Sequence, residues 1–339
     1  MRKYLLIEKK ENISSFLLKN SLYFVSNKKI YSNVNNNFVN INSNNIYSVE
    51  NLILSDTKKV YDFNLENYQI FINDDFQYRR HYYKNIVIFN NESNAFFYDI
   101  IKNQLMRKID LNSLKTYGAI YNFINEYSII LVNSTIISSF DYIQEKTIWQ
   151  YDLETYFHQP AQIMEGRVLV SNNKIIFFAH TEDWSNYATF VLDAQTGQVL
   201  FTTQEMGMKL VEHNNLVYQI QRKAIKILDP KNLKIETIDV SAYCDEQSIF
   251  LDDHTVFFYK DKLYTLAREQ GSDVYNIWVV FNLKTQLFEY REDMYINPKK
   301  KKDEKNKMFI NDIQANDNLV AIRCSDNLYV FEKQDIESK

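Results

Sequence analysis

The sequence contains few of the residues that usually form turns and crosslinks: 5 glycines, 3 prolines and 2 cysteines in 339 residues. Cys244 and Cys324 lie far apart, so nothing indicates a disulfide framework or a zinc site. No apolar run approaches the roughly 18 residues of a membrane helix. At the start of the chain, four apolar residues (Tyr4 to Ile7) precede Glu8, whereas a secretory signal needs roughly 7–15. We therefore expect a cytoplasmic protein without a membrane partner.

The motifs of common enzyme classes are also missing: the glycine-rich phosphate loop, GxSxG and HExxH. The five histidines have no metal-ligand spacing. Two groups come nearest to a site: His180 with Glu182 and Asp183, in a predicted surface loop, and Asp252–His254, in a predicted turn between strands. Polar turn chemistry explains both. Cys244 precedes two acidic residues, which raise a thiol pKa and disfavour a reactive thiolate. We predict no catalytic residue, no metal and no cofactor.

The chain is instead rich in strand-forming residues. It is 45% hydrophobic and contains 25 tyrosines and 23 phenylalanines, which suit half-buried strands and exclude global disorder. Asparagine and aspartate replace glycine in the turns, because their side chains hydrogen-bond locally and tolerate left-handed backbone. The net charge of −4 argues against nucleic acid as a partner.

One short pattern recurs: an apolar strand, an Asp or Asn, a polar turn and a second apolar strand. The copies are Phe97–Ile109, Phe140–Tyr151, Val191–Phe201, Ile227–Ile238 and Val280–Tyr290. The aligned Asp or Asn positions are Asp62, Asp99, Asp141, Asp193, Asp229 and Asn282. Successive positions are 36–53 residues apart, close to the roughly 40–50 residues of one propeller blade. The pattern predicts an all-β repeat fold without intervening helices.

Within Val191–Phe201, the phrase LDAQTGQVLF resembles the hairpin between the third and fourth strands of pyrroloquinoline-quinone-type propeller repeats. More loosely, it resembles WD40-like repeats. The resemblance implies a β-propeller of four-stranded blades, with eight blades expected and seven as the alternative. With 3 tryptophans in the chain, a ring of docking tryptophans cannot form, so the resemblance carries no quinone-binding signature.

The two ends of the chain are predicted to form one blade. The C-terminal region supplies three strands, Phe309–Ala315, Leu319–Arg323 and Leu328–Phe331, and then stops. Lys3–Ile7 precedes the first complete unit and has no partner there. Pairing it beside Leu328–Phe331 would remove two exposed strand edges. We therefore expect residues 1–339 to form a single propeller domain.

Two blades carry polar insertions between their second and third strands, at His180–Tyr187 and Arg268–Tyr275. Loops of an antiparallel blade alternate between its two ends, so these insertions and the crossovers between blades should share one face. Aromatic anchors rimmed by charge are typical of protein-binding patches. The predicted partner-binding residues are Tyr156, Phe157, His158, His180, Asp183, Trp184, Tyr187, Tyr243, Asp245, Glu246, Asp273, Tyr275, Lys299, Lys300, Lys301 and Lys302.

These features favour a non-catalytic, protein-binding propeller. A bacterial immunity protein, an antitoxin whose acidic patch caps a basic toxin active site, is the specific hypothesis. The alternatives are a carbohydrate-active hydrolase or lyase with a site in the central channel, and a small-ligand sensor. The lysine run at 299–302 indicates either a contact with an anionic or acidic partner or a solvated loop.

Overall fold

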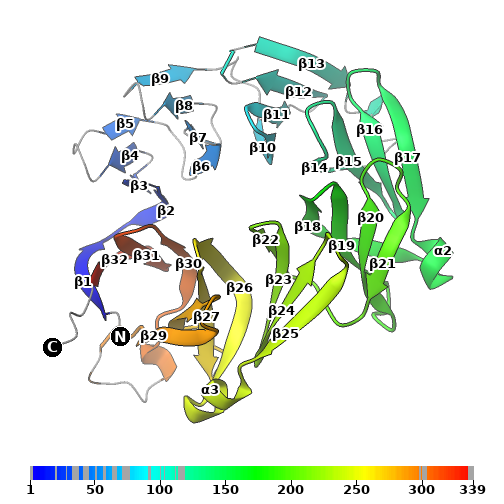
Figure 1. Ribbon diagram of the computed structural model, residues 1–339. Coiled ribbons are helices and arrows are strands. Elements are labelled where there is room, and N and C mark those ends of the chain that lie inside the picture. The colour runs from blue at the N-terminus through cyan, green and yellow to red at the C-terminus, as the bar shows by residue number, and fades with distance from the viewer. Residues whose placement is uncertain are drawn as a thin grey trace. The chain divides into compact units, whose positions relative to one another are not determined.

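A computed structural model provides the structure of the protein. It describes residues 3–19, 21–27, 29–32, 38–40, 46–49, 52–55, 59–62, 67–70, 77–90, 93–99, 101–102, 104–110, 112–113, 119–297, 299 and 304–334. Strands dominate this part of the chain, as the sequence predicts (Figure 1). The short helical segments discussed below are α2 (Glu154–Phe157), α3 (Ser241–Glu246) and the 3-10 turn η2 (Glu304–Asn306).

Across the described ranges the strands form eight four-stranded sheets, and consecutive strands are neighbours in each sheet. The first four sheets contain β2 (Ile13–Leu18), β3 (Leu22–Ser26), β4 (Lys29–Ser32) and β5 (Phe38–Asn40); β6 (Ile46–Val49), β7 (Leu52–Ser55), β8 (Lys59–Asp62) and β9 (Asn67–Ile70); β10 (Gln77–Tyr83), β11 (Ile86–Asn90), β12 (Asn94–Asp99) and β13 (Gln104–Asp110); and β14 (Ala119–Phe123), β15 (Ser128–Asn133), β16 (Ile136–Asp141) and β17 (Lys146–Asp152).

The remaining four sheets follow the same pattern. They contain β18 (Ala161–Ser171), β19 (Lys174–Thr181), β20 (Tyr187–Asp193) and β21 (Val199–Thr203); β22 (Leu210–His213), β23 (Leu216–Gln221), β24 (Ala224–Asp229) and β25 (Lys234–Asp239); β26 (Ile249–Tyr259), β27 (Lys262–Glu269), β28 (Ile277–Asn282) and β29 (Leu287–Asp293); and β30 (Ile310–Ala315), β31 (Leu319–Cys324), β32 (Asn327–Gln334) and β1 (Lys3–Lys10).

The last sheet joins the two ends of the chain. β1 pairs antiparallel with β32, from Lys3 opposite Gln334 to Lys10 opposite Leu328. The register shifts between Leu6 and Glu8, which marks a β-bulge. The predicted pairing of the N-terminal segment with the final C-terminal strand is therefore confirmed. It supplies the fourth strand and covers the edge of β32.

The recurring Asp or Asn explains how the chain turns with so few glycines. In the β12–β13 hairpin, Asp99 Oδ1 accepts the backbone N–H groups two and three residues later, at 3.1 and 2.9 Å. Asp141, Asp193 and Asn282 accept the same pair of N–H groups in their own hairpins. Each side chain thus replaces backbone hydrogen bonds within the turn. The residue therefore recurs in these hairpins because it stabilises the turn between the third and fourth strands.

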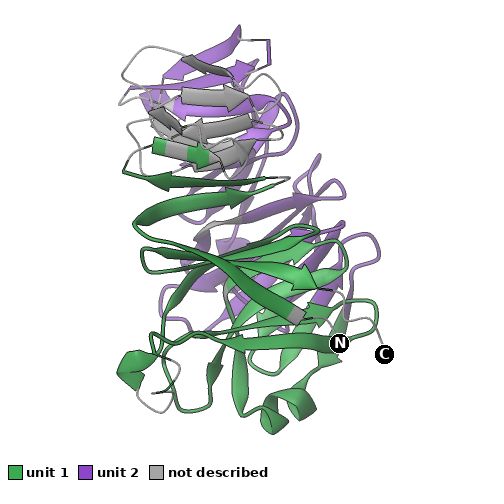
Figure 2. Cartoon of the chain, turned by 90° about the vertical axis from the view of Figure 1, so that its left-hand side faces the viewer, with its two compact units in different colours: residues 1–46, 220–226, 236–339 green, residues 47–219, 227–235 purple. Residues whose placement is uncertain are grey.

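The chain separates into two compact units, coloured in Figure 2. Unit 1 comprises residues 1–46, 220–226 and 236–339, and unit 2 comprises residues 47–219 and 227–235. The single domain expected from the sequence therefore stays a prediction.

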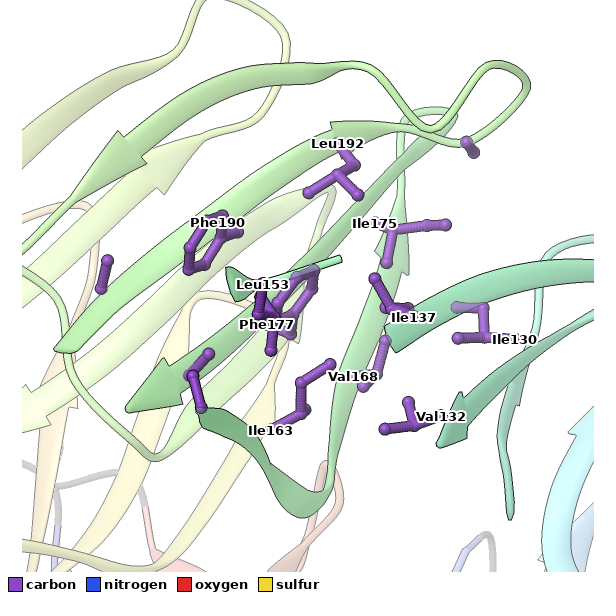
Figure 3. Close-up of a cluster of buried hydrophobic side chains, with 14 of the residues drawn as sticks. Ile130, Val132, Ile137, Leu153, Ile163, Val168, Ile175, Phe177, Phe190 and Leu192 are labelled. Atoms are coloured by element: carbon purple, nitrogen blue, oxygen red, sulfur yellow. The ribbon is translucent and has the colours of Figure 1, made fainter. Parts of the chain in front are cut away.

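One hydrophobic core cluster of unit 2 lies between the β14–β17 and β18–β21 sheets (Figure 3). Alternate residues of the strands point into it, such as Ile175 and Phe177 on β19, and Phe190 and Leu192 on β20. The Phe177 and Phe190 rings stack 5.2 Å apart. This two-residue spacing is the pleat of a strand, which places every second side chain on the same face.

One hydrophobic core cluster of unit 1 contains residues from the β26–β29 sheet and from the sheet that joins the chain ends. Tyr4 of β1 is buried there, with its ring edge-on to Trp278 of β28 at 5.3 Å and 4.4 Å from the ring of Tyr290 on β29. The N-terminal strand therefore contributes to the core of this unit as well as to strand pairing.

Candidate functional site

In unit 2, the crossover after β17 and the loop between β19 and β20 lie side by side. Tyr156 and Phe157 of α2 pack against Phe190 at 5.0 and 5.7 Å between ring centroids. Gln159 Nε2 donates to Ser185 Oγ at 3.5 Å. The structure thus brings together the two predicted segments of this unit.

The β19–β20 loop is held by a network centred on Asp183. Its Oδ1 accepts hydrogen bonds from Thr181 Oγ1 at 2.7 Å, from the Ser185 backbone N–H at 3.0 Å and from Ser185 Oγ at 2.8 Å. These donors, Thr181 first, lower the pKa of Asp183 to about 2. The carboxylate therefore stays ionised at neutral pH and down to about pH 3. Its three hydrogen bonds hold the loop in a defined turn.

Trp184 occupies the tip of this loop with φ at 60°, in the left-handed region that bulky residues rarely adopt. Its indole ring stacks on His180, with centroids 3.5 Å apart and planes 15° apart. His180 is 2% exposed and belongs to β19. The sequence placed His180 in a surface loop, and that placement was wrong because the strand continues to Thr181.

Exposure divides the predicted residues of unit 2. Trp184, Tyr187 and Tyr156 are 48%, 41% and 39% exposed, whereas Phe157 is buried like His180. His158 is exposed and ends α2 in left-handed backbone, donating its N–H to the carbonyl of Glu154. We call the exposed set the Trp184 surface: Tyr156, His158, Asp183, Trp184 and Tyr187.

In unit 1, α3 and the β27–β28 loop are connected through Asp245. Asp245 Oδ1 accepts from Lys223 Nζ at 2.5 Å and from Gln270 Nε2 at 3.3 Å. Lys223 is the main cause of the lowered pKa of Asp245. Asp273, fully exposed, pairs with Arg268 at 3.2 Å. Two of the predicted carboxylates are therefore paired with cations.

The other predicted residues of unit 1 differ in their surroundings. Tyr243 is half-buried and stacks on Phe288 of β29 at 3.9 Å, while Glu246 is exposed at the end of α3. Tyr275 packs edge-on to Phe309 at 6.1 Å. Lys299 is exposed, and its backbone N–H donates to Asn297 Oδ1 at 3.0 Å. Lys300, Lys301 and Lys302 lie outside the described residues.

Sequence reasoning missed an aromatic residue whose ring has three cationic side chains around it. Phe250, at the start of β26, has Arg222 and Lys223 at 5.6 Å and Arg268 at 5.9 Å from its ring centroid. A cation near an aromatic face is attracted by the ring quadrupole. Arg222 and Lys223 are neighbours in the β23–β24 turn, whereas Arg268 lies on β27 and Phe250 on β26. Because the cluster joins three separate segments of the chain, no local signal could have identified it.

The Asp252–His254 segment was predicted to form a turn, and that prediction was wrong. The segment lies inside β26, which runs from Ile249 to Tyr259. The pairing register of β26 with β27 shifts between Asp252 and Val256. A bulge accommodates polar residues within a strand because the extra residue leaves the regular pairing.

Both cysteines are buried free thiols. Burial, reinforced by Asp245, raises the pKa of Cys244 to about 11, and burial raises the pKa of Cys324 to about 12. Among the described residues, no group of three or more His, Cys, Asp or Glu side chains could hold a metal ion. In the same part of the chain, no helix has the length and apolar character needed to cross a membrane.

No protein family model matches the sequence, and no curated protein matches it. Solved structures do share its fold. Sqt1 of Saccharomyces cerevisiae superposes with a TM-score of 0.58 at 8% identity, over 97% of this chain and 97% of that one. The Cps50 (Swd1) β-propeller domain of Myceliophteria thermophila gives 0.51 at 8% identity, over 97% and 99%. BamB of Moraxella catarrhalis gives 0.46 at 10% identity, over 85% and 96%.

The similarities to Sqt1 and to the Cps50 domain identify the fold as a β-propeller, which confirms the class expected from the repeated hairpins. At identities this low they establish the fold alone. The function has to be argued from the surfaces of this chain.

Proposed function

We propose that the protein is a non-catalytic, protein-binding β-propeller and that its partner contacts the Trp184 surface. The backbone of Trp184 carries the proposal. Left-handed backbone costs an L-residue about 1–2 kcal/mol, yet a large aromatic residue occupies it at an exposed loop tip. Strain retained at an exposed position is a reason to infer function.

The geometry suits a protein partner. The Asp183 network and the stacking on His180 fix the indole before any partner arrives, so little side-chain freedom is lost on binding. Tyr156 and Tyr187 add apolar area with hydroxyl groups beside it. Tryptophan and tyrosine are the residues that most often dominate binding energy at protein interfaces.

A toxin is the specific partner that we propose, with this chain acting as its immunity protein. The support is electrostatic: hydrogen bonds keep the Asp183 carboxylate ionised beside Trp184, and the whole chain has a net charge of −4. A basic active site would find an aromatic anchor and a fixed negative charge side by side. The proposal includes no enzymatic activity and a cytoplasmic location.

We also propose that the propeller has eight blades in a single domain, residues 1–339. The eight four-stranded sheets found in the described ranges support this number, as does the completion of the last sheet by β1. Calorimetry tests the single domain: one unfolding transition, with equal calorimetric and van't Hoff enthalpies, is expected. Two separated transitions would assign the units to independent domains.

The binding proposal is tested by comparing two alanine variants. The product of a genetically adjacent gene is purified, and its affinity for the wild-type protein is measured by calorimetry. Trp184→Ala should weaken binding about 30-fold or more, as expected for a central anchor. Tyr127→Ala is the matched control, because Tyr127 is also an exposed aromatic residue of unit 2 but lies in the β14–β15 turn. Equal effects of the two variants would remove the Trp184 surface from the interface.

A further inference from the structure

A cavity of about 270 Å³ in unit 1 is lined by an excess of positive charge. It opens among the β26–β27 turn, the start of the β28–β29 turn, the β30–β31 turn and the end of β32. Four lysines and two aspartates supply its charged groups, a formal net charge of +2: Lys260, Lys262, Lys284, Lys333, Asp261 and Asp317. None of these residues belongs to the Trp184 surface or to the predicted partner-binding residues of unit 1.

Two of the lysines form the fixed part of the cavity. Lys262 is largely buried and donates to Glu289, which also accepts from Asn282 Nδ2 at 2.7 Å. Lys333 donates to the carbonyl of Asn316 and lies 5.3 Å from the ring centroid of Tyr259. Partly buried stems and defined partners hold both ammonium groups in place. Counting Glu289 behind the lining still leaves the site positive.

The other two lysines stand at the rim in exposed ion pairs. Lys284 pairs with Asp261 at 2.6 Å, and Lys260 pairs with Asp317. All four side chains of these pairs are about half exposed or more, so solvent screening makes each pair weak. An anion that enters the cavity can therefore replace Asp261 and Asp317 as the partner of the rim lysines, without any change in the backbone.

We propose that this cavity binds a compact phosphate-bearing anion. Lysine is a point-charge ligand for phosphate, and a doubly charged phosphate can be contacted by several ammonium groups at once. Polar neighbours such as Tyr259 and Asn282 complete the lining. The size of the cavity suits a small anion and excludes a folded partner. The site lies in unit 1 and does not depend on the function proposed for the Trp184 surface.

The test measures the binding of inorganic phosphate and of pyrophosphate to the full-length protein by calorimetry, with citrate as a carboxylate probe. Saturable binding of a phosphate compound, tighter than that of citrate, is expected. Lys333→Gln should weaken it about tenfold, the typical effect of losing one charge-assisted hydrogen bond. Lys146→Gln is the matched control, because Lys146 is an exposed lysine at the start of β17 and the change in net charge is identical.

A second variant predicts an effect of opposite sign. Asp317→Asn removes the carboxylate that competes for Lys260, so phosphate should bind about two- to fivefold more tightly. This result does not depend on whether Lys333→Gln folds normally. The proposal is overturned if no phosphate compound binds, if citrate binds as tightly, if Lys146→Gln weakens binding as much as Lys333→Gln, or if Asp317→Asn leaves the affinity unchanged or lower.

Discussion

Gly197 and Gly271 offer a matched pair of substitutions that tests the packing of the repeated hairpin. Both glycines have left-handed backbone, with φ at 72° and 88°. A Cβ added to Gly197 would lie 2.5 Å from Cε3 and 2.6 Å from Cδ2 of Trp149. A Cβ added to Gly271 would meet no described atom within 4 Å. Alanine at both positions therefore separates the steric clash from the cost of the backbone.

The indole of Trp149 cannot move aside easily. It is buried in the core of unit 2, and its Nε1 donates to the carbonyl of Ala194 at 3.0 Å. Left-handed backbone costs alanine about 1–2 kcal/mol relative to glycine at either site. Overpacking a filled core adds about 1–3 kcal/mol at Gly197 alone. We expect Gly197→Ala to lower the free energy of unfolding by about 2–5 kcal/mol and Gly271→Ala by about 1–2 kcal/mol.

Equilibrium unfolding in urea measures both free energies, followed by circular dichroism and by tryptophan fluorescence. The entropy that alanine removes from the unfolded chain is the same in both variants and cancels from their difference. In a Trp149→Leu background, Gly197→Ala should lower the free energy of unfolding by less than it does in the wild type, since the clashing ring is then absent. Equal destabilisation by the two alanine variants, within about 0.5 kcal/mol, would refute the packing argument.

Three further predictions concern single residues. Tyr4→Ala should lower the free energy of unfolding in urea by about 3–5 kcal/mol, because the Tyr4 ring is buried edge-on to a core tryptophan. The control is Leu5→Ala, on the exposed side of the same strand, which should lower it by less than about 1 kcal/mol. Burial raises the pKa of Asp312 to about 6, so the folded state binds its proton more tightly than the unfolded state does. The contribution of Asp312 to the free energy of unfolding should therefore fall as pH rises from about 4 to about 6. Over that interval, the free energy of unfolding of Asp312→Asn relative to the wild type should rise by an amount on the order of 2–3 kcal/mol. A difference that does not change with pH would contradict this prediction. Cys244 and Cys324 are buried and have raised pKa values. In the native protein at about pH 8 they should resist a thiol reagent, and they should react fully once the protein is unfolded. Rapid labelling of the native protein would show instead that these thiols are accessible.

Much of the fold could be predicted because its signals are local. The apolar residues mark the strands, and an Asp or Asn after the third strand marks six of the hairpins. The Asp99 and Asp141 turns show why this works, since each side chain bonds to N–H groups two and three residues away. The pairing of β1 with β32 is long-range, yet it was predictable because each sheet needs a fourth strand and an open edge is unfavourable.

The sequence by itself therefore determined most of the strands, the turns built on Asp and Asn, and the propeller class, because these depend on neighbours within a few residues. The tertiary structure alone decided which side chains meet. His180 is buried under Trp184, and Phe250 is surrounded by cations from β27 and the β23–β24 turn. Lysines from two turns, from the start of β27 and from the end of β32 line one cavity. The cation cluster and the cavity join residues that are far apart in the chain, so the pattern within a single strand does not predict these contacts.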